Sequence, residues 1–219
     1  MRIAGKEISK VAVVDDDRRV RESTAEIIAD MNLKPTKITS VGPLSDFVSR
    51  MVSEFHAVVC DHRLKSHGYA SFQGARAFPR LYRSYVPSVL CTAFSDAEPD
   101  EFRRYRRYIP ALVTSAADTD AIVRGWEACI REFRNEYSPQ REPVQTLVRI
   151  AAVDMGSKQR IAFAIVPGWD TRQVVRFPVD IVRLSLRRFL RPDARFFAKV
   201  NIGAETPGDL YLSDFEYRG

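Results

Sequence analysis

The first 136 residues alternate short apolar runs with amphipathic helix patterns. Between residues 44 and 55, apolar side chains recur at the i, i+3, i+4, i+7 spacing of a helix that buries one face. Five apolar runs are predicted to be strands: 10–14, 35–41, 56–60, 86–92 and 109–113. Strands separated by helices predict an α/β fold, a doubly wound five-stranded parallel sheet covered on both faces.

The pattern changes near residue 140. Residues 137–143 hold two prolines and no apolar periodicity, which is typical of a linker. From 144 to 219 the pattern predicts three strands, a short helix and two further strands. We therefore expect a receiver-sized domain at 1–136 and a small C-terminal β-barrel-like domain at 144–219. Both an OB-like and an SH3-like barrel fit this order.

A short segment with four arginines, 98–108, is predicted to be a polar helix of the first domain. Phe102, Tyr105 and Ile109 lie at the spacing of an inward face. Its arginines then form either a solvated helix face or a surface for a partner.

Composition narrows the class of protein. The chain has 219 residues, of which 45% are hydrophobic and 28% charged, as in ordinary globular domains. No apolar run reaches the roughly 18 residues of a membrane span, and the N-terminus lacks the apolar core of a secretory signal. Three cysteines without short spacing provide neither a disulfide framework nor a zinc site. We expect a cytoplasmic protein with no membrane partner.

The positive charge is concentrated towards the C-terminus. Of the net charge of +6, residues 1–140 carry +2 and residues 141–219 carry +4. Such an excess favours an acidic partner for the second domain, although it is modest for a dedicated nucleic-acid binder.

Acidic side chains follow two of the predicted strands. Asp15 and Asp16 come after the first strand, Asp61 after the third, and Thr92 ends the fourth. The carboxyl ends of parallel strands meet at one edge of a sheet, so these side chains are expected in one pocket. Clustered carboxylates repel unless a cation neutralises them, and oxygen-only ligands favour Mg²⁺. An aspartate beside Mg²⁺ can attack phosphorus and form an acyl phosphate.

These pieces resemble the receiver domains of two-component response regulators. The resemblance covers roughly residues 8–135 and rests on three motifs in order: Val13–Asp17, Val58–Leu64 and Ser88–Phe94. It implies a flavodoxin-like receiver fold and a phosphoprotein of a phosphorelay, acting in signal transduction.

The resemblance also implies roles for single residues. Asp61 is the implied phosphoacceptor, which would carry the aspartyl phosphate. Asp15, Asp16, Asp61 and the backbone carbonyl of Arg63 are the implied ligands of magnesium (Mg²⁺). Thr92 is the implied switch hydroxyl that contacts the phosphoryl group.

One departure from the family concerns the fifth strand. The family has a lysine there, usually followed by proline, whereas this chain has Thr114 and Ser115. That lysine normally pairs with the phosphoryl group and helps to move the switch. The missing lysine therefore affects the coupling of phosphorylation to shape change more than the acceptor chemistry.

The second domain gives fewer functional signals. It shows no pair of helices for a helix-turn-helix, and no His or Cys follows Cys129, so no catalytic constellation is expected. We expect a response regulator that is not an enzyme beyond self-phosphorylation and self-dephosphorylation. The expected partners are a sensor histidine kinase or phosphotransfer protein, an unidentified output protein, and a second copy in a homodimer. One alternative is an unphosphorylated receiver-like scaffold whose basic barrel binds nucleic acid; another is a phosphate sink.

Overall fold

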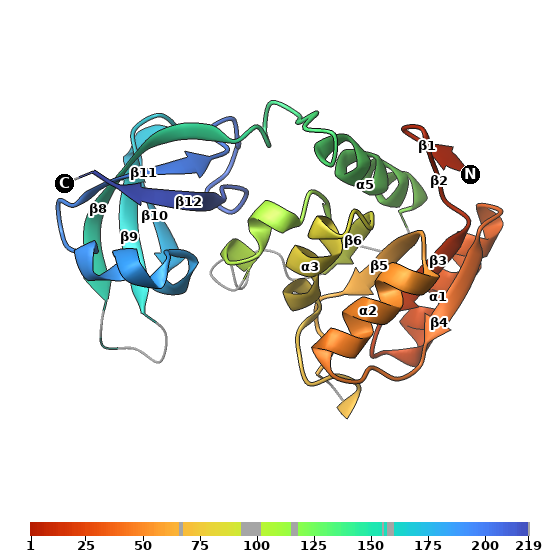
Figure 1. Ribbon diagram of the computed structural model, residues 1–219. Helices are drawn as coiled ribbons and strands as arrows, with labels where there is room; N and C mark the ends of the chain where they lie inside the picture. The colour runs from red at the N-terminus through yellow and green to blue at the C-terminus, as the bar shows by residue number, and fades with distance from the viewer. Residues whose placement is uncertain (66–67, 93–101, 115–117, 155, 157–159, 219) are drawn as a thin grey trace. The chain divides into compact units, whose positions relative to one another are not determined.

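The structure is a computed structural model that describes all residues except 66–67, 93–101, 115–117, 155, 157–159 and 219 (Figure 1). It divides into two compact units. Unit 1 comprises Met1–Ala97 and Tyr108–Glu136, and unit 2 comprises Glu98–Arg107 and Tyr137–Gly219. Among the described residues, none of the helices is both long enough and apolar enough to cross a membrane.

Unit 1 is built on a parallel sheet. Its strands are β3 (Lys10–Val14), β4 (Lys34–Ile38), β5 (Ala57–Asp61), β6 (Ser88–Cys91) and β7 (Leu112–Val113). Their order is β4-β3-β5-β6-β7, which is the doubly wound flavodoxin-like order with its switch point between β3 and β5. The predicted α/β sheet is therefore confirmed. A short antiparallel ribbon, β1 (Arg2–Ile3) and β2 (Lys6–Glu7), precedes it.

Helices pack on this sheet because the strands are apolar on both faces. The helices are α1 (Arg18–Asp30), α2 (Leu44–Glu54), α3 (Phe78–Arg83), which follows the 3₁₀ turn η2 (Gly74–Ala77), and α5 (Thr119–Glu132). Residues of α1 and α5 share one core with alternate strand residues: Val11, Val13, Val59 and Val89. The intervening residues, including Ala12 and Val58, are equally buried, as expected for a sheet covered on both sides.

The segment predicted as a polar helix at 98–108 is described only from residue 102 onward. Residues 102–107 belong to unit 2; Phe102 and Arg103 are helical, and the 3₁₀ turn η3 (Arg106–Tyr108) follows. Arg103 and Arg106 are buried rather than on a solvated face, because their guanidinium groups are bound by oxygen atoms of unit 2.

Unit 2 contains one antiparallel sheet. Its strands are β8 (Val144–Asp154), β9 (Ile161–Val166), β10 (Asp170–Pro178), β11 (Arg195–Val200) and β12 (Leu212–Tyr217), in the order β10-β9-β8-β11-β12. Phe177, Phe196 and Phe215 meet in its core. Pairing between β10 and β12, which would close a barrel, is not among the strand pairs of the described residues, so the expected barrel is not shown.

Two further segments of unit 2 differ from their patterns. The predicted short helix is two 3₁₀ turns, η4 (Val179–Ile181) and η5 (Leu184–Phe189). Within the predicted linker 137–143, Arg141 is buried and the Tyr211 hydroxyl donates to its carbonyl oxygen at 2.6 Å. This part of the segment is thus packed into unit 2.

Candidate metal centre

The acidic residues gather because two neighbouring strands end side by side. β3 pairs with β5 so that Val14 lies opposite Cys60, which brings the residues after Val14 level with Asp61. Asp17 then caps α1 by accepting from the main-chain N–H groups of Arg19 and Val20. This cap turns the chain directly after β3 and leaves Asp15 and Asp16 at the sheet edge.

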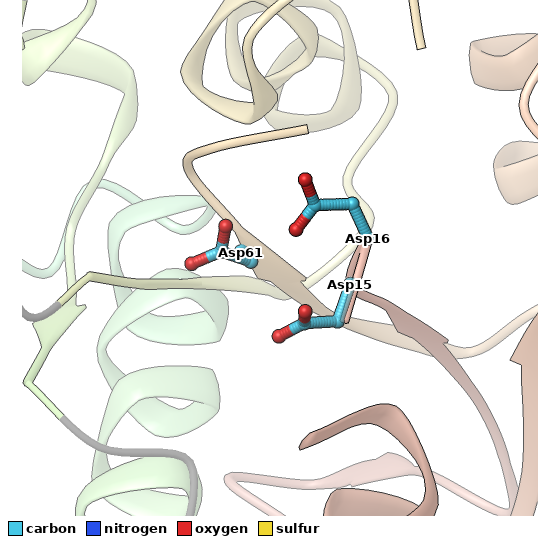
Figure 2. A group of neighbouring side chains, drawn as sticks. All are labelled: Asp15, Asp16 and Asp61. Carbon is cyan, nitrogen blue, oxygen red and sulfur yellow. The ribbon is translucent and has the colours of Figure 1, made fainter. Parts of the chain in front are cut away.

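The three carboxylates form one cluster. One oxygen from each of Asp15, Asp16 and Asp61 lies within 4.8 Å of the other two, and all three residues are half-buried (Figure 2). An Mg²⁺ ion with oxygen ligands at 2.0–2.1 Å spans about 4 Å from ligand to ligand. The predicted side chains are therefore brought together, and small rotations would let one cation contact all three.

The electrostatics of the cluster are unfavourable without a cation. Burial, followed by the charge of Asp15, raises the pKa of Asp61 to about 7, although the main-chain N–H groups of Arg63 and His62 oppose this. Burial also raises the pKa of Asp15 to about 6, against a hydrogen bond from the Asp17 N–H at 2.8 Å. A divalent cation would relieve both the burial cost and the mutual repulsion.

A buried arginine holds the loop that carries the acids. The Arg21 guanidinium donates to the backbone carbonyl of Asp15 rather than to a carboxylate, and it lies over the Tyr69 ring with 5.6 Å to the centroid. The Tyr69 hydroxyl donates to the Ile38 carbonyl at 2.5 Å. Arg21 thus fixes the backbone of the loop while the carboxylate oxygens remain turned to the cluster.

The two threonines singled out from the sequence sit at the same sheet edge. Asp61 lies opposite Cys91, and Cys91 opposite Val113, so Thr92 and Thr114 each follow at the level of the site. Thr92 is buried, and its N–H donates to the Val113 carbonyl at 2.8 Å. Thr114, which the resemblance aligns with the family's lysine, is exposed. Ser115 lies outside the described residues, and the role of the Arg63 carbonyl stays a prediction.

Gly74 is a residue of the site that sequence reasoning missed. A Cβ atom there would lie 2.0 Å from the Asp61 carbonyl oxygen and 3.0 Å from the Cys60 sulfur. The Gly74 N–H also donates to the His62 carbonyl at 2.8 Å. The chain at Gly74, where the 3₁₀ turn η2 begins, therefore approaches the Asp61 backbone so closely that only glycine fits. A single glycine before a helix gives no sequence signal of this approach.

Comparisons with known proteins were made for the whole chain. No family model and no curated protein matches it. Three solved receiver domains are similar in structure. A CheY-like response regulator receiver domain from Methanospirillum hungatei JF-1 is 13% identical, with a TM-score of 0.42, and the match covers 59% of this chain and 99% of that one.

The other two matches are similar in extent. The signal receiver domain of a modulated diguanylate cyclase from Desulfovibrio desulfuricans G20 is 18% identical, with a TM-score of 0.45, over 59% of this chain and 99% of that one. A response regulator receiver domain protein from Clostridium thermocellum is 9% identical, with a TM-score of 0.43, over 58% and 98%. At such identities and TM-scores these likenesses do not by themselves assign a function.

Proposed function

We propose that unit 1 is the receiver of a response regulator that accepts a phosphoryl group on Asp61, with Mg²⁺ held by Asp15, Asp16 and Asp61. The observation that supports it is the cluster of three carboxylate oxygens within 4.8 Å at the switch point of a doubly wound sheet. If these aspartates only capped turns, their clustering in one half-buried site would be unfavourable, because like charges at this distance repel.

The chain's own groups account for the transfer. An ionised Asp61 oxygen attacks the phosphorus of a phosphohistidine or a small acyl phosphate; the new O–P bond forms as the P–N or P–O bond of the donor breaks. The donor leaves as neutral imidazole after protonation by solvent, or as a carboxylate. The Thr92 hydroxyl then donates a hydrogen bond to a phosphoryl oxygen. Bound Mg²⁺ would supply the positive charge that offsets the transferring group.

A matched pair of aspartates tests this assignment. The full chain and its Asp61→Asn and Asp46→Asn variants are incubated with acetyl phosphate, with Mg²⁺ or with EDTA. Asp46 serves as the control because it lies exposed in the first turn of α2. Intact-mass analysis should show one added phosphoryl group on the wild type and on Asp46→Asn in Mg²⁺ only. Equal labelling of Asp61→Asn would refute the assignment.

We propose output by protein–protein contact through unit 2, with at most self-phosphorylation and self-dephosphorylation as activity. The rival is a scaffold that is not phosphorylated and binds nucleic acid. One observation favours the rival: Arg149 and Arg195 lie directly opposite each other on exposed positions of β8 and β11, where like charges repel. The Asp193 carboxylate, 3.6 Å from Arg149, offsets only part of this charge. Binding of labelled single-stranded DNA to the full chain over a salt series separates the two.

A further inference from the structure

A segment of the chain that lies between two strands of unit 1 is bound inside unit 2. Arg103 is 4% exposed and donates to two main-chain carbonyl oxygens, those of Leu210 at 2.8 Å and Pro207 at 2.6 Å. Arg106, 8% exposed, donates to a carboxylate oxygen of Asp209 at 2.9 Å. The two arginines are three residues apart, and both are received by a run of four residues, 207–210.

The receiving loop, residues 207–210, is held in place by the buried side chain of Asn201. Asn201 is fully buried; its amide donates to the carbonyls of Gln140 at 2.9 Å and Asp209 at 3.1 Å, and its oxygen accepts from the Tyr211 N–H at 2.6 Å. These bonds lie within 137–219 and do not involve the arginine segment. The loop is therefore organised by its own part of the chain.

Arg141 completes the receiving surface. Its guanidinium donates to the carbonyls of Arg106 and Arg107, each at 3.0 Å, and lies over the Tyr211 ring at 5.0 Å. The bound segment thus offers two guanidinium groups and two carbonyls, and the loop with Arg141 offers the complementary partners. Guanidinium groups bound through several oxygens in fixed geometry are a recognition arrangement rather than a solvated charged face.

We propose that residues 201–211, together with Arg141, form a binding site for a peptide with two arginines three residues apart, and that the chain's own 102–107 fills it. Every contact of the bound segment named above joins residues at least 30 positions apart, so contacts distant in the sequence hold the segment in place. The same bonds form when an identical segment is presented from outside, as in exchange of an element between two copies. This inference stands whether or not Asp61 is phosphorylated.

The test is binding of a peptide in trans. A fluorescent peptide of residues 98–110 is titrated with the wild-type chain and with the full chain carrying Arg103→Met and Arg106→Met. This variant (the emptied chain) loses both guanidinium groups of the bound segment and keeps the Arg141 bonds to its two carbonyls. The emptied chain should bind at least tenfold more tightly than the wild type, whose site is already filled. A peptide with both arginines replaced by methionine should lose at least tenfold in affinity. Equal binding of both peptides, or none at about 1 mM, would overturn the proposal.

Two controls keep the result interpretable. A peptide with Arg104→Met should bind within a few-fold of the original, because Arg104 pairs with Asp180 at 2.7 Å, outside the loop, and is partly exposed. If the emptied chain loses structure in unit 2, the original peptide must restore the amide hydrogen-exchange protection of 201–211, and the methionine peptide must not. Failure to restore it counts against the site.

Discussion

The two units hold half-buried and buried charge in opposite ways. In unit 1, Asp15, Asp16 and Asp61 share one edge of the sheet, where burial and then the charge of Asp15 raise the pKa of Asp61 to about 7. In unit 2, Arg103 and Arg106 are buried but donate to two carbonyls and one carboxylate. At Asp15, burial outweighs the nearby charge of Arg21, whereas oxygen atoms of the chain itself bind the guanidinium groups in unit 2.

In our proposals, this difference separates a site that takes a metal ion from a site that the chain's own segment fills. The pKa of Asp209 lies below its ordinary value: burial alone would raise it, but hydrogen bonds from Thr206 and Arg106 and the charges of Arg106 and Arg141 outweigh burial. The pKa of Asp61 moves the other way because nothing comparable offsets its burial. The pKa values of Asp61 and Asp209 are thus shifted in opposite directions, and variants and Mg²⁺ should affect the two units differently.

The largest effect is expected from removing the arginine that secures the bound segment. Arg141→Met removes the donors to the buried carbonyl of Arg106 and the partly buried carbonyl of Arg107, at about 1–3 kcal/mol each. Unit 2 should lose about 3 kcal/mol of unfolding free energy, measured by hydrogen exchange at β8 and β11. Arg131→Met, which breaks an exposed pair with Glu127 on α5, should cost less than about 1 kcal/mol. Equal losses would mean that Arg141 is not structural.

The second effect is stabilisation of unit 1 alone by Mg²⁺. A ligand at about one hundred times its Kd adds about 2.7 kcal/mol to the free energy of unfolding. The gain should appear in hydrogen exchange at β3 and β5, vanish in Asp16→Asn, and persist in Asp46→Asn. The stability of unit 2 should not respond to Mg²⁺, since the Asp209 carboxylate is already paired with Arg106. A gain of the same size in both units would indicate non-specific binding and contradict the contrast.

A third effect tests the close approach behind the acceptor. Gly74→Ala places a methyl group against the Asp61 backbone and should cost about 1–3 kcal/mol and weaken Mg²⁺ binding. Gly42→Ala is the matched control, because no atom lies within 4 Å of the added Cβ there. Mg²⁺ titrations followed by hydrogen exchange of β5 compare the two variants. Unchanged binding in Gly74→Ala would show that the loop relaxes without moving Asp61.

Sequence patterns predicted more of unit 1 than of unit 2, and the reason is physical. Asp15 and Asp61 close apolar strands, and the alignment of parallel strand ends follows from the fold class, so their meeting was predictable. Arg103 donates to main-chain carbonyls, which every residue has and no sequence pattern identifies. The sequence therefore placed Arg106 on a solvated helix face or a partner surface, and Arg141 in a linker. Gly74 was missed because its constraint is a distance between segments.

The pH dependence of unit 1 is a fourth, smaller effect. The folded-state pKa values of Asp15, about 6, and Asp61, about 7, lie above their ordinary value, so the folded state binds protons more tightly than the unfolded state. In EDTA, the stability of unit 1 should be greatest near pH 4 and fall by about 1 kcal/mol as pH rises through 7, after allowance for solvent screening. Mg²⁺ should flatten this dependence. A rise in stability between pH 5 and 7 in EDTA would contradict the raised values.

The smallest effect comes from giving unit 1 a counter-charge of its own, as unit 2 has. Thr114→Lys adds an ammonium group at an exposed position directly after β7, one residue beyond Val113, which is level with Asp61 across β6. An exposed cation near the cluster is worth less than about 1 kcal/mol, so the stability of unit 1 in EDTA at pH 7 should rise slightly and its pH dependence should weaken.

The Thr114→Lys substitution should also reduce the stabilisation of unit 1 by Mg²⁺, because part of the repulsion among the three carboxylates is then relieved without metal. Thr36→Lys, on β4 at the opposite edge of the sheet, controls for added charge and should change neither quantity. Urea unfolding with and without Mg²⁺, followed by hydrogen exchange at β5, measures both. If Thr114→Lys leaves the Mg²⁺ gain and the pH dependence untouched, Thr114 does not face the carboxylates. The missing lysine would then have no electrostatic counterpart at this edge.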